Sequence, residues 1–136
     1  MLDRGAGTIV STCSVNAVLP NPLVIDCSAA KAALLNLSKS LPKQEVGPRG
    51  ARVNTASPGP VSTQLWLGED GVEATVARTI GTEAEDVAKQ AATDAVTGWF
   101  TRPEEVDDLI VLVASDRAGN VTGSDFVIDG GLITTL

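Results

Sequence analysis

Residues 101–131 read TRPEEVDDLIVLVASDRAGNVTGSDFVIDGG and contain the clearest structural signals of the chain. A threonine at Thr101, a proline in the following turn at Pro103 and a glutamate three residues after the threonine at Glu104 form the pattern of a capping box. A helix is therefore expected to begin directly after Thr101.

This helix is expected to have one buried face. Four apolar residues recur at the spacing of one side of an α-helix: Val106, Leu109, Ile110 and Val113. A turn at 118–120 follows, and residues 125–129 form an apolar, β-branched run closed by two glycines. The stretch therefore predicts a helix, a turn and a strand.

Two further strands precede this unit. Residues 8–13 form a β-branched run after a glycine-rich turn, and residues 51–56 form a second run that the sequence Ser-Pro-Gly-Pro at 57–60 stops abruptly. Residues 16–22 contain two prolines and two asparagines and predict a loop.

A second helix is expected between these strands, with Asp26 as its N-cap. Its expected buried face contains five apolar residues at helical spacing: Ala30, Ala33, Leu34, Leu37 and Leu41. Pro42 removes a helical hydrogen bond, so the helix either ends near Leu41 or kinks there.

The acidic, alanine-rich stretch 68–98 predicts one or two amphipathic helices that lie over another part of the molecule. Strands that alternate with helices indicate parallel βαβ units. The fold class is therefore α/β with a parallel sheet of about three strands and flanking helices, forming a single unit over residues 1–136.

Composition excludes several classes of function. The chain has 136 residues, a formal net charge of −7 and no histidine, so a phosphate-tracking nucleic-acid binder, a Ser–His–Asp triad and a histidine metal site are not expected. Two cysteines do not suffice for a thiolate metal site, and no apolar run is long enough to cross a membrane. We expect a cytoplasmic protein with free thiols and no metal.

The carboxyl ends of parallel strands are where ligands bind in open α/β sheets. In this chain those ends fall near Cys13-Ser14, Ser57-Pro58-Gly59 and Gly130-Gly131. These small and hydroxyl residues allow a ligand to approach the backbone closely, although Ser14 also suits a loop hydroxyl that bonds to its own backbone.

Cys27 and Lys31 lie one helical turn apart at the start of the expected helix. The lysine charge and the helix N-terminus together favour a thiolate at Cys27 and hence a reactive thiol. The alternatives are a small buried cysteine and a solvated lysine, which are the commoner situations for these residue types.

Nearly the whole chain resembles the C-terminal half of the short-chain dehydrogenase/reductase family, which are NAD(P)-dependent oxidoreductases with a Rossmann-like, doubly wound fold. Five segments carry the resemblance in order: 7–15 as a strand that ends in the active-site serine, 27–34 as the Tyr-x-x-x-Lys helix, 52–63 as the strand and Pro-Gly turn beside the nicotinamide, 101–106, and 122–131.

The resemblance implies roles for particular residues. Ser14 would hydrogen-bond the substrate oxygen, and Lys31 would bind the nicotinamide ribose and lower the pKa of the catalytic group. Four residues would line the nicotinamide side: Pro58, Gly59, Val61 and Thr63. The stretch 68–98 would be the variable substrate lid, and the partner would be a small alcohol or carbonyl compound with NAD or NADP as cofactor.

Three departures from the family pattern bear on activity. Cys27 stands at the position of the catalytic tyrosine, and the chain contains no tyrosine. The N-terminal half of the family fold, which carries the glycine-rich dinucleotide loop, has no counterpart in the chain. Gly5-x-Gly7 does not supply that loop, because it precedes a strand instead of opening a helix. Pro42 interrupts a helix that is normally continuous.

These observations lead to an expectation and two alternatives. We expect a truncated, catalytically impaired member of the family, a pseudoenzyme, with an exposed edge at strand 8–13 that favours association. One alternative is a non-enzymatic interaction module, either as a homo-oligomer or paired with an intact relative. The other is a new thiol chemistry at Cys27.

Overall fold

The computed structural model describes residues 1–134, and its centre is a three-stranded parallel sheet in the order β1-β2-β3. The strands are β1 (Gly7–Thr12), β2 (Ala51–Pro58) and β3 (Asp125–Ile128). The pairing places Gly7 opposite Ala51, and Thr55 opposite Asp125. The parallel sheet expected from the alternating elements is confirmed.

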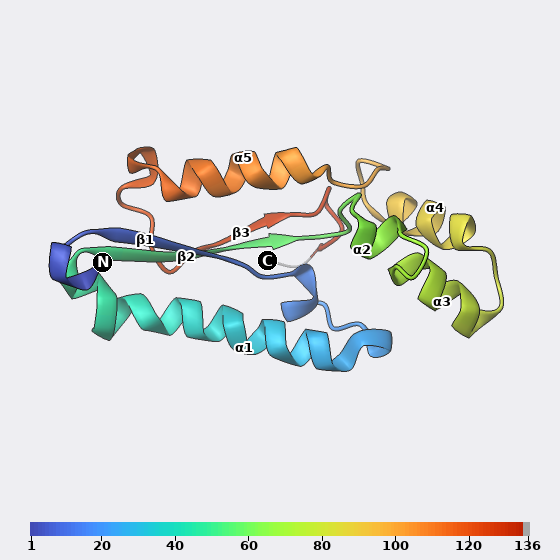
Figure 1. Ribbon diagram of the computed structural model, residues 1–136, viewed down its shortest axis with the longest axis horizontal. Coiled ribbons are helices and arrows are strands. Elements are labelled where there is room, and N and C mark those ends of the chain that lie inside the picture. Colours follow the sequence, from blue (N-terminus) through green and yellow to red (C-terminus); the bar gives the residue numbers. More distant parts are fainter. Residues whose placement is uncertain (135–136) are drawn as a thin grey trace.

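Helices cover both faces of this sheet, as Figure 1 shows. α1 (Ile25–Leu41) lies on one face and α5 (Pro103–Ala114) on the other, which is the layering of a doubly wound Rossmann-like unit. Three shorter helices lie beyond the carboxyl ends of the strands: α2 (Gln64–Leu67), α3 (Val72–Ile80) and α4 (Ala84–Asp94). No helix within residues 1–134 has the length and apolar character needed to span a bilayer.

The apolar core lies between β2 and the segment that follows α1. Val46, Ala51 and Val53 are buried there, and Leu2, Ile9 and Leu41 pack against them. α1 ends at Leu41, and Pro42 begins a wide turn of π type that extends to Val46. Of the two expected outcomes, an end or a kink, the structure shows that the α-helix ends at Leu41, and the turn brings Val46 into the core.

The start and the buried face of α1 differ from the sequence-based expectation. Val24 occupies the N-cap, so Asp26 lies inside the first turn. The residues buried against the rest of the molecule are Ser28, Leu35 and Ser38, whereas Ala30, Ala33 and Leu37 of the expected face are exposed. The helix has two neighbouring apolar stripes, and the sheet covers the one that contains Leu35.

The start of α5 is displaced by one residue from the expected capping box. Arg102 is the N-cap, and its backbone N–H donates to the Glu105 carboxylate at 2.8 Å. This bond, together with the bond from the Arg102 guanidinium, holds the pKa of the Glu105 carboxyl below its ordinary value. Thr101 is instead buried in a short parallel bridge with Val61, which removes it from the capping position.

β2 continues two residues beyond its expected end. Ser57 and Pro58 pair with Val127 and Ile128 of β3, and the chain leaves the sheet only at Gly59. A proline is tolerated as the last residue of a strand because its missing N–H is not needed there.

The expected apolar face of α5 is confirmed, since Val106 and Val113 are buried and Leu109 and Ile110 are partly buried.

Arg52 of β2 connects the sheet to the carboxyl end of α5. Its guanidinium lies within 3.2 Å of five oxygens: the carbonyls of Val113, Ala114, Ser115 and Val121 and the hydroxyl of Thr8. The last carbonyls of a helix have no partner within the helix and carry partial negative charge, so a cation satisfies both needs at once.

We expect Arg52→Met to lower the free energy of unfolding by about 3–5 kcal/mol, because the shorter apolar side chain leaves several half-buried carbonyls unpaired. Urea unfolding followed by circular dichroism measures this loss. Arg117→Met is the matched control, since Arg117 lies in the following turn and its side chain has no comparable bonds within residues 1–134; a change of about 0.5 kcal/mol is expected there. Equal losses in both variants would contradict this role of Arg52.

Candidate functional site

Lys31 of α1 is fixed to the carboxyl end of β1. Its Nζ donates to the carbonyl of Thr12 at 2.9 Å, and its own carbonyl accepts a hydrogen bond from the buried Cys13 thiol at 3.3 Å. An ammonium group has three protons, so two remain for a ligand after the bond to Thr12. The structure thus brings Lys31 to the strand end that precedes Ser14.

Ser14 follows directly after this strand end. Its Oγ accepts a hydrogen bond from the backbone N–H of Asn16 at 3.1 Å and caps the short turn Val15–Ala17. The side chain therefore has the loop-capping role that the sequence left open. Because the oxygen acts as acceptor in that bond, the hydroxyl proton remains available to a substrate oxygen.

Cys27 lies in the first turn of α1, one turn before Lys31 and on the same side of the helix. Its side chain is half-buried, and it is a free thiol. Within residues 1–134, no hydrogen bond joins Cys27 to Lys31, whose ammonium group is bonded to Thr12. The Lys31 ammonium group therefore binds the carboxyl end of β1 and not the Cys27 thiol. A reactive thiol at Cys27 stays a prediction.

The turn after β2 approaches the end of β3 closely. The N–H of Gly59 donates to the carbonyl of Ile128 at 2.9 Å. A Cβ at Gly59 would lie 2.9 Å from the Cβ and 3.0 Å from the Cα of Asp129, so no side chain fits there without displacing β3. Asp129 in turn accepts bonds from the N–H groups of Gly131 and Ile133.

Val61 and Thr63 lie on the segment that leaves this turn. The Val61 bridge to Thr101 ties the segment to the start of α5, and Thr101 also donates its N–H to the Pro60 carbonyl at 3.0 Å. Thr63 is the N-cap residue of α2, although its side chain makes no capping bond. Pro58, Gly59, Val61 and Thr63 thus form one continuous path from β2 to α2.

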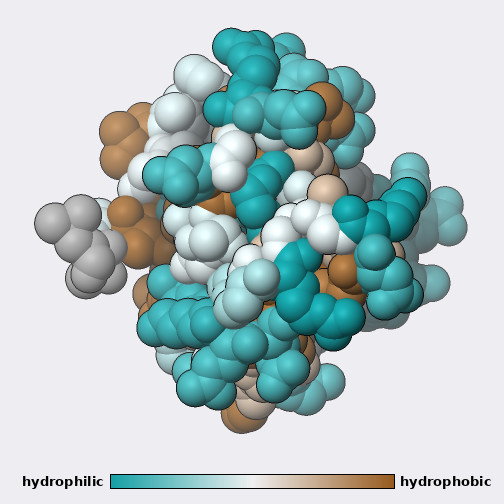
Figure 2. Space-filling model, turned by 90° about the vertical axis from the view of Figure 1, so that its left-hand side faces the viewer, coloured by the Kyte–Doolittle hydropathy of each residue, from teal (hydrophilic) through white to brown (hydrophobic). Residues whose placement is uncertain are grey.

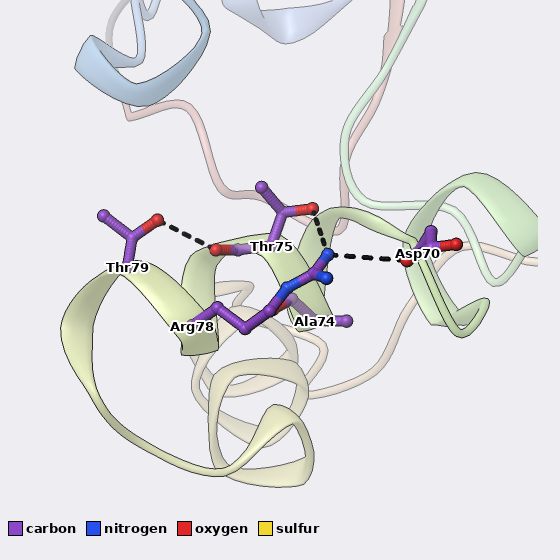
Figure 3. A network of polar contacts seen from close by, with 5 residues as sticks. All are labelled: Asp70, Ala74, Thr75, Arg78 and Thr79. Carbon is purple, nitrogen blue, oxygen red and sulfur yellow. Dashed lines mark hydrogen bonds and ion pairs between the residues drawn. The ribbon is translucent and has the colours of Figure 1, made fainter.

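The stretch 68–98 contains the helices α3 and α4, as the sequence predicts, and they pack against each other with Ala77 buried between elements. Figure 3 shows the polar contacts that hold the beginning of α3: Arg78 donates to the Thr75 hydroxyl and the Ala74 carbonyl and forms an ion pair with Asp70 at 3.6 Å. These contacts are exposed, so they order the segment locally and contribute little to stability.

Aromatic packing joins the two chain segments that flank this stretch. The rings of Trp66 in α2 and Phe100 before α5 meet edge to face, with centroids 5.3 Å apart. The backbone N–H of Trp66 also donates to the Thr63 carbonyl at 3.0 Å, so its fluorescence is expected to respond to a ligand bound at the segment 58–63.

Sequence reasoning did not foresee three contacts that shape this region. Cys13 ties β1 to α1, Thr12 supplies the carbonyl that holds Lys31, and Asp129 fixes the turn opposite Gly59. The Asp-Gly-Gly sequence at 129–131 was a usable signal, because a carboxylate followed by two glycines is typical of a turn in which the side chain accepts nearby N–H groups. In the other two contacts the acceptor is a backbone carbonyl, which leaves no trace in the sequence.

The residues at this edge fit only part of a dinucleotide cofactor. The two remaining Lys31 protons suit ribose hydroxyls, and the open turn at Gly59 suits a flat ring. A glycine-rich turn that leads directly from a strand into a helix, which would hold the diphosphate, does not occur in residues 1–134. The same residues contain no group of three or more side chains of the types that hold a metal ion.

Known proteins resemble this chain in both sequence and structure. A family model described as enoyl-(acyl carrier protein) reductase matches residues 1–133. The chain is 35% identical over 136 residues to 2-(S)-hydroxypropyl-CoM dehydrogenase 3 of Xanthobacter autotrophicus, covering 97% of this chain and 48% of the relative. It is 31% identical over 134 residues to 3-oxoacyl-(acyl-carrier-protein) reductase FabG of Thermotoga maritima, covering 98% and 48%.

The similarity extends to solved structures. L-sorbose reductase of Gluconobacter frateurii, solved in complex with NADPH and L-sorbose, matches with a TM-score of 0.83 and 31% identity, covering 100% of this chain and 51% of that one. The chain therefore spans about half the length of the relatives it matches. Its fold is similar to that of the matching half of L-sorbose reductase.

We expect Gly59→Ala to lower the free energy of unfolding by about 1–3 kcal/mol, because the new methyl group must displace the backbone of Asp129. Urea unfolding measures the change. Gly119→Ala is the control: Gly119 has an ordinary φ of −56°, and we expect a change within about 0.5 kcal/mol. If the two variants unfold alike, the close approach at Gly59 does not constrain the turn.

Proposed function

The chain belongs to the short-chain dehydrogenase/reductase family, and we propose that the carboxyl ends of β1 and β2 form the substrate and nicotinamide side of an oxidoreductase site. The reaction class is NAD(P)-dependent hydride transfer on an alcohol or carbonyl compound. We further propose that the 136-residue chain by itself is catalytically impaired.

The proposed roles follow from the bonds that each residue leaves unused. Ser14 donates its free hydroxyl proton to the substrate oxygen, and Lys31 donates its two remaining protons to the nicotinamide ribose. Pro58, Gly59, Val61 and Thr63 line the ring, and residues 68–98 close over the substrate as a lid. The nicotinamide, when bound, accepts or donates the hydride.

Cys27 is the observation that carries the proposed impairment. It stands four residues before Lys31, where the family resemblance places a tyrosine, and the chain has no tyrosine or histidine to replace it. A thiol ends close to the helix backbone, whereas a phenol extends several ångströms further, and a proton can be transferred only within hydrogen-bond reach. The site therefore lacks the group that exchanges a proton with the substrate oxygen.

A first prediction concerns cofactor affinity. Because no glycine-rich turn holds the diphosphate, we expect titration with NADH or NADPH to give no saturable change in Trp66 and Trp99 fluorescence at micromolar concentrations. Saturation in that range would contradict the proposed lack of cofactor binding, and the cofactor concentration at half-saturation would then give the affinity.

A second arm tests the role of position 27 separately. At cofactor concentrations high enough to force binding, Cys27→Tyr is expected to reduce ketones about 10²-fold faster than Cys27→Phe, because general acid catalysis contributes at least that much. The phenylalanine variant has the same ring without the hydroxyl, so it controls for packing. Equal rates in the two variants would remove position 27 from the proposed mechanism.

A second candidate function is a non-enzymatic interaction module that pairs with an intact relative or with a second copy. Exposed apolar residues of α1 favour it: Ala30, Ala33 and Leu37 lie exposed on one side of a helix whose other side is packed, and Leu37 is 55% exposed. These three residues form the apolar stripe of α1. β1 also has only one neighbour in the sheet of the described residues, which leaves its outer backbone groups available for pairing.

Size-exclusion chromatography with a full-length family member tests this candidate. We expect co-elution of the two proteins, and loss of co-elution with Leu37→Glu, because a charge on the apolar stripe opposes its burial. Gln44→Glu adds the same charge to an exposed residue outside the stripe and is expected to leave co-elution unchanged. Elution of the parent chain as a monomer beside the intact relative would count against an interaction module.

A further inference from the structure

A concave pocket of about 320 Å³ lies at the amino end of the sheet, opposite the end that carries the proposed oxidoreductase site. It lies between the carboxyl end of α1 and the loop that leads into β3. Five residues line it: Lys39, Pro42, Lys43, Thr122 and Gly123.

Two lysines form one wall of this pocket. Lys39 lies in the last turn of α1, and Lys43 lies in the wide turn that follows. Neither ammonium group pairs with a carboxylate of residues 1–134, where the ion pairs involve only arginines. Lys39 also interacts favourably with the helix dipole because it lies in the last turn of α1. The dipole does not explain Lys43, which lies beyond the helix and lines the same pocket.

The opposite wall is a loop whose position is fixed by the sheet. The Thr122 hydroxyl oxygen accepts the N–H of Val53 at 3.1 Å, and the Gly123 N–H donates to the Val53 carbonyl at 2.7 Å. Gly123 has a φ of +71°, which favours glycine. The Thr122 oxygen is an acceptor in its only bond, so its proton is free to donate into the pocket.

The charge distribution of the chain supports an anion at this end. Five of the ten basic residues lie on the segments that form it, namely Arg4, Lys39, Lys43, Arg49 and Arg117, against only three of the 17 acidic residues, Asp3, Glu45 and Asp116. Figure 2 views the molecule from this end and shows hydrophilic residues over most of the face. A locally positive surface on a chain of net charge −7 attracts small anions to one place.

We propose that this pocket binds a phosphate-type dianion, held by the ammonium groups of Lys39 and Lys43 and by the hydroxyl of Thr122. Lysine acts as a point charge toward phosphate, and a hydroxyl donor from a rigid loop adds direction to the site. The pocket shares no residue with the proposed oxidoreductase site, so it does not depend on that function.

Inorganic phosphate is the first probe, with sodium chloride of equal ionic strength as the reference. We expect saturable changes in the amide resonances of Thr122 and Gly123 and a rise of Tm with phosphate concentration, because a ligand that binds only the folded state stabilises it. The double variant Lys39→Gln with Lys43→Gln is expected to weaken binding at least tenfold. Lys89→Gln removes one exposed lysine of α4 and is expected to bind phosphate as the parent does.

Thr122→Val keeps both lysines and removes the hydroxyl donor. Because it also removes the acceptor of the Val53 N–H, its Tm without phosphate is compared with that of the parent to show that the loop is retained. This variant is expected to weaken phosphate binding about three- to tenfold. A phosphate response that is equal in the parent, the double variant and Thr122→Val would overturn the proposal, as would the absence of any saturable response in the parent. Vesicles containing phosphatidic acid form a second arm: binding to vesicles together with free phosphate assigns the source to a lipid headgroup, and binding of free phosphate alone assigns it to a soluble compound.

Discussion

The side chain of Arg52 joins the sheet to the helix that covers one of its faces. Its guanidinium reaches the last carbonyls of α5, the Thr8 hydroxyl of β1 and the Val121 carbonyl. Asn54, two residues along β2 and fully buried, bonds to the same Val121 carbonyl and to the N–H of Ser124. Because residues 121–124 lead into β3, the position of that strand depends on these two side chains. β3 in turn places Asp129 against Gly59, so the geometry of the candidate site depends on a contact at the opposite end of the sheet.

The sequence was sufficient for the parallel sheet, the order of its elements and the helical stretch 68–98, because these depend on local periodicity and turn residues. It was insufficient where two local solutions compete. α1 carries adjacent apolar stripes about 100° apart, and periodicity alone does not choose between them. Only the packing of Leu35 under the sheet decides, and it leaves Leu37 exposed. Thr101 is likewise a good capping residue, but the bridge to Val61 removes it, and Glu105 closes the box with Arg102.

The candidate site shows the same division between local and long-range information. The spacing of Cys27 and Lys31 places them on one side of a helix, and the structure agrees because that relation is local. The partner of Lys31 was not foreseen, because a backbone carbonyl 19 residues earlier in the chain has no sequence signature. The approach of Gly59 to Asp129 joins two strand ends far apart in the sequence. Such contacts follow from the register of β2 with β3, which the pattern of apolar residues specifies only in outline.

The bonds that hold the candidate site together do not depend on the side chain of Cys27. The stability of the fold and the chemistry of the site can therefore change independently. The strand end is held by Cys13 and Thr12 through Lys31, and the turn after β2 is held by Gly59, Asp129 and the Val61 bridge. Within residues 1–134, none of these bonds involves the side chain at position 27. The side chain at position 27 can therefore vary at small cost in stability, whatever its effect on the proposed chemistry.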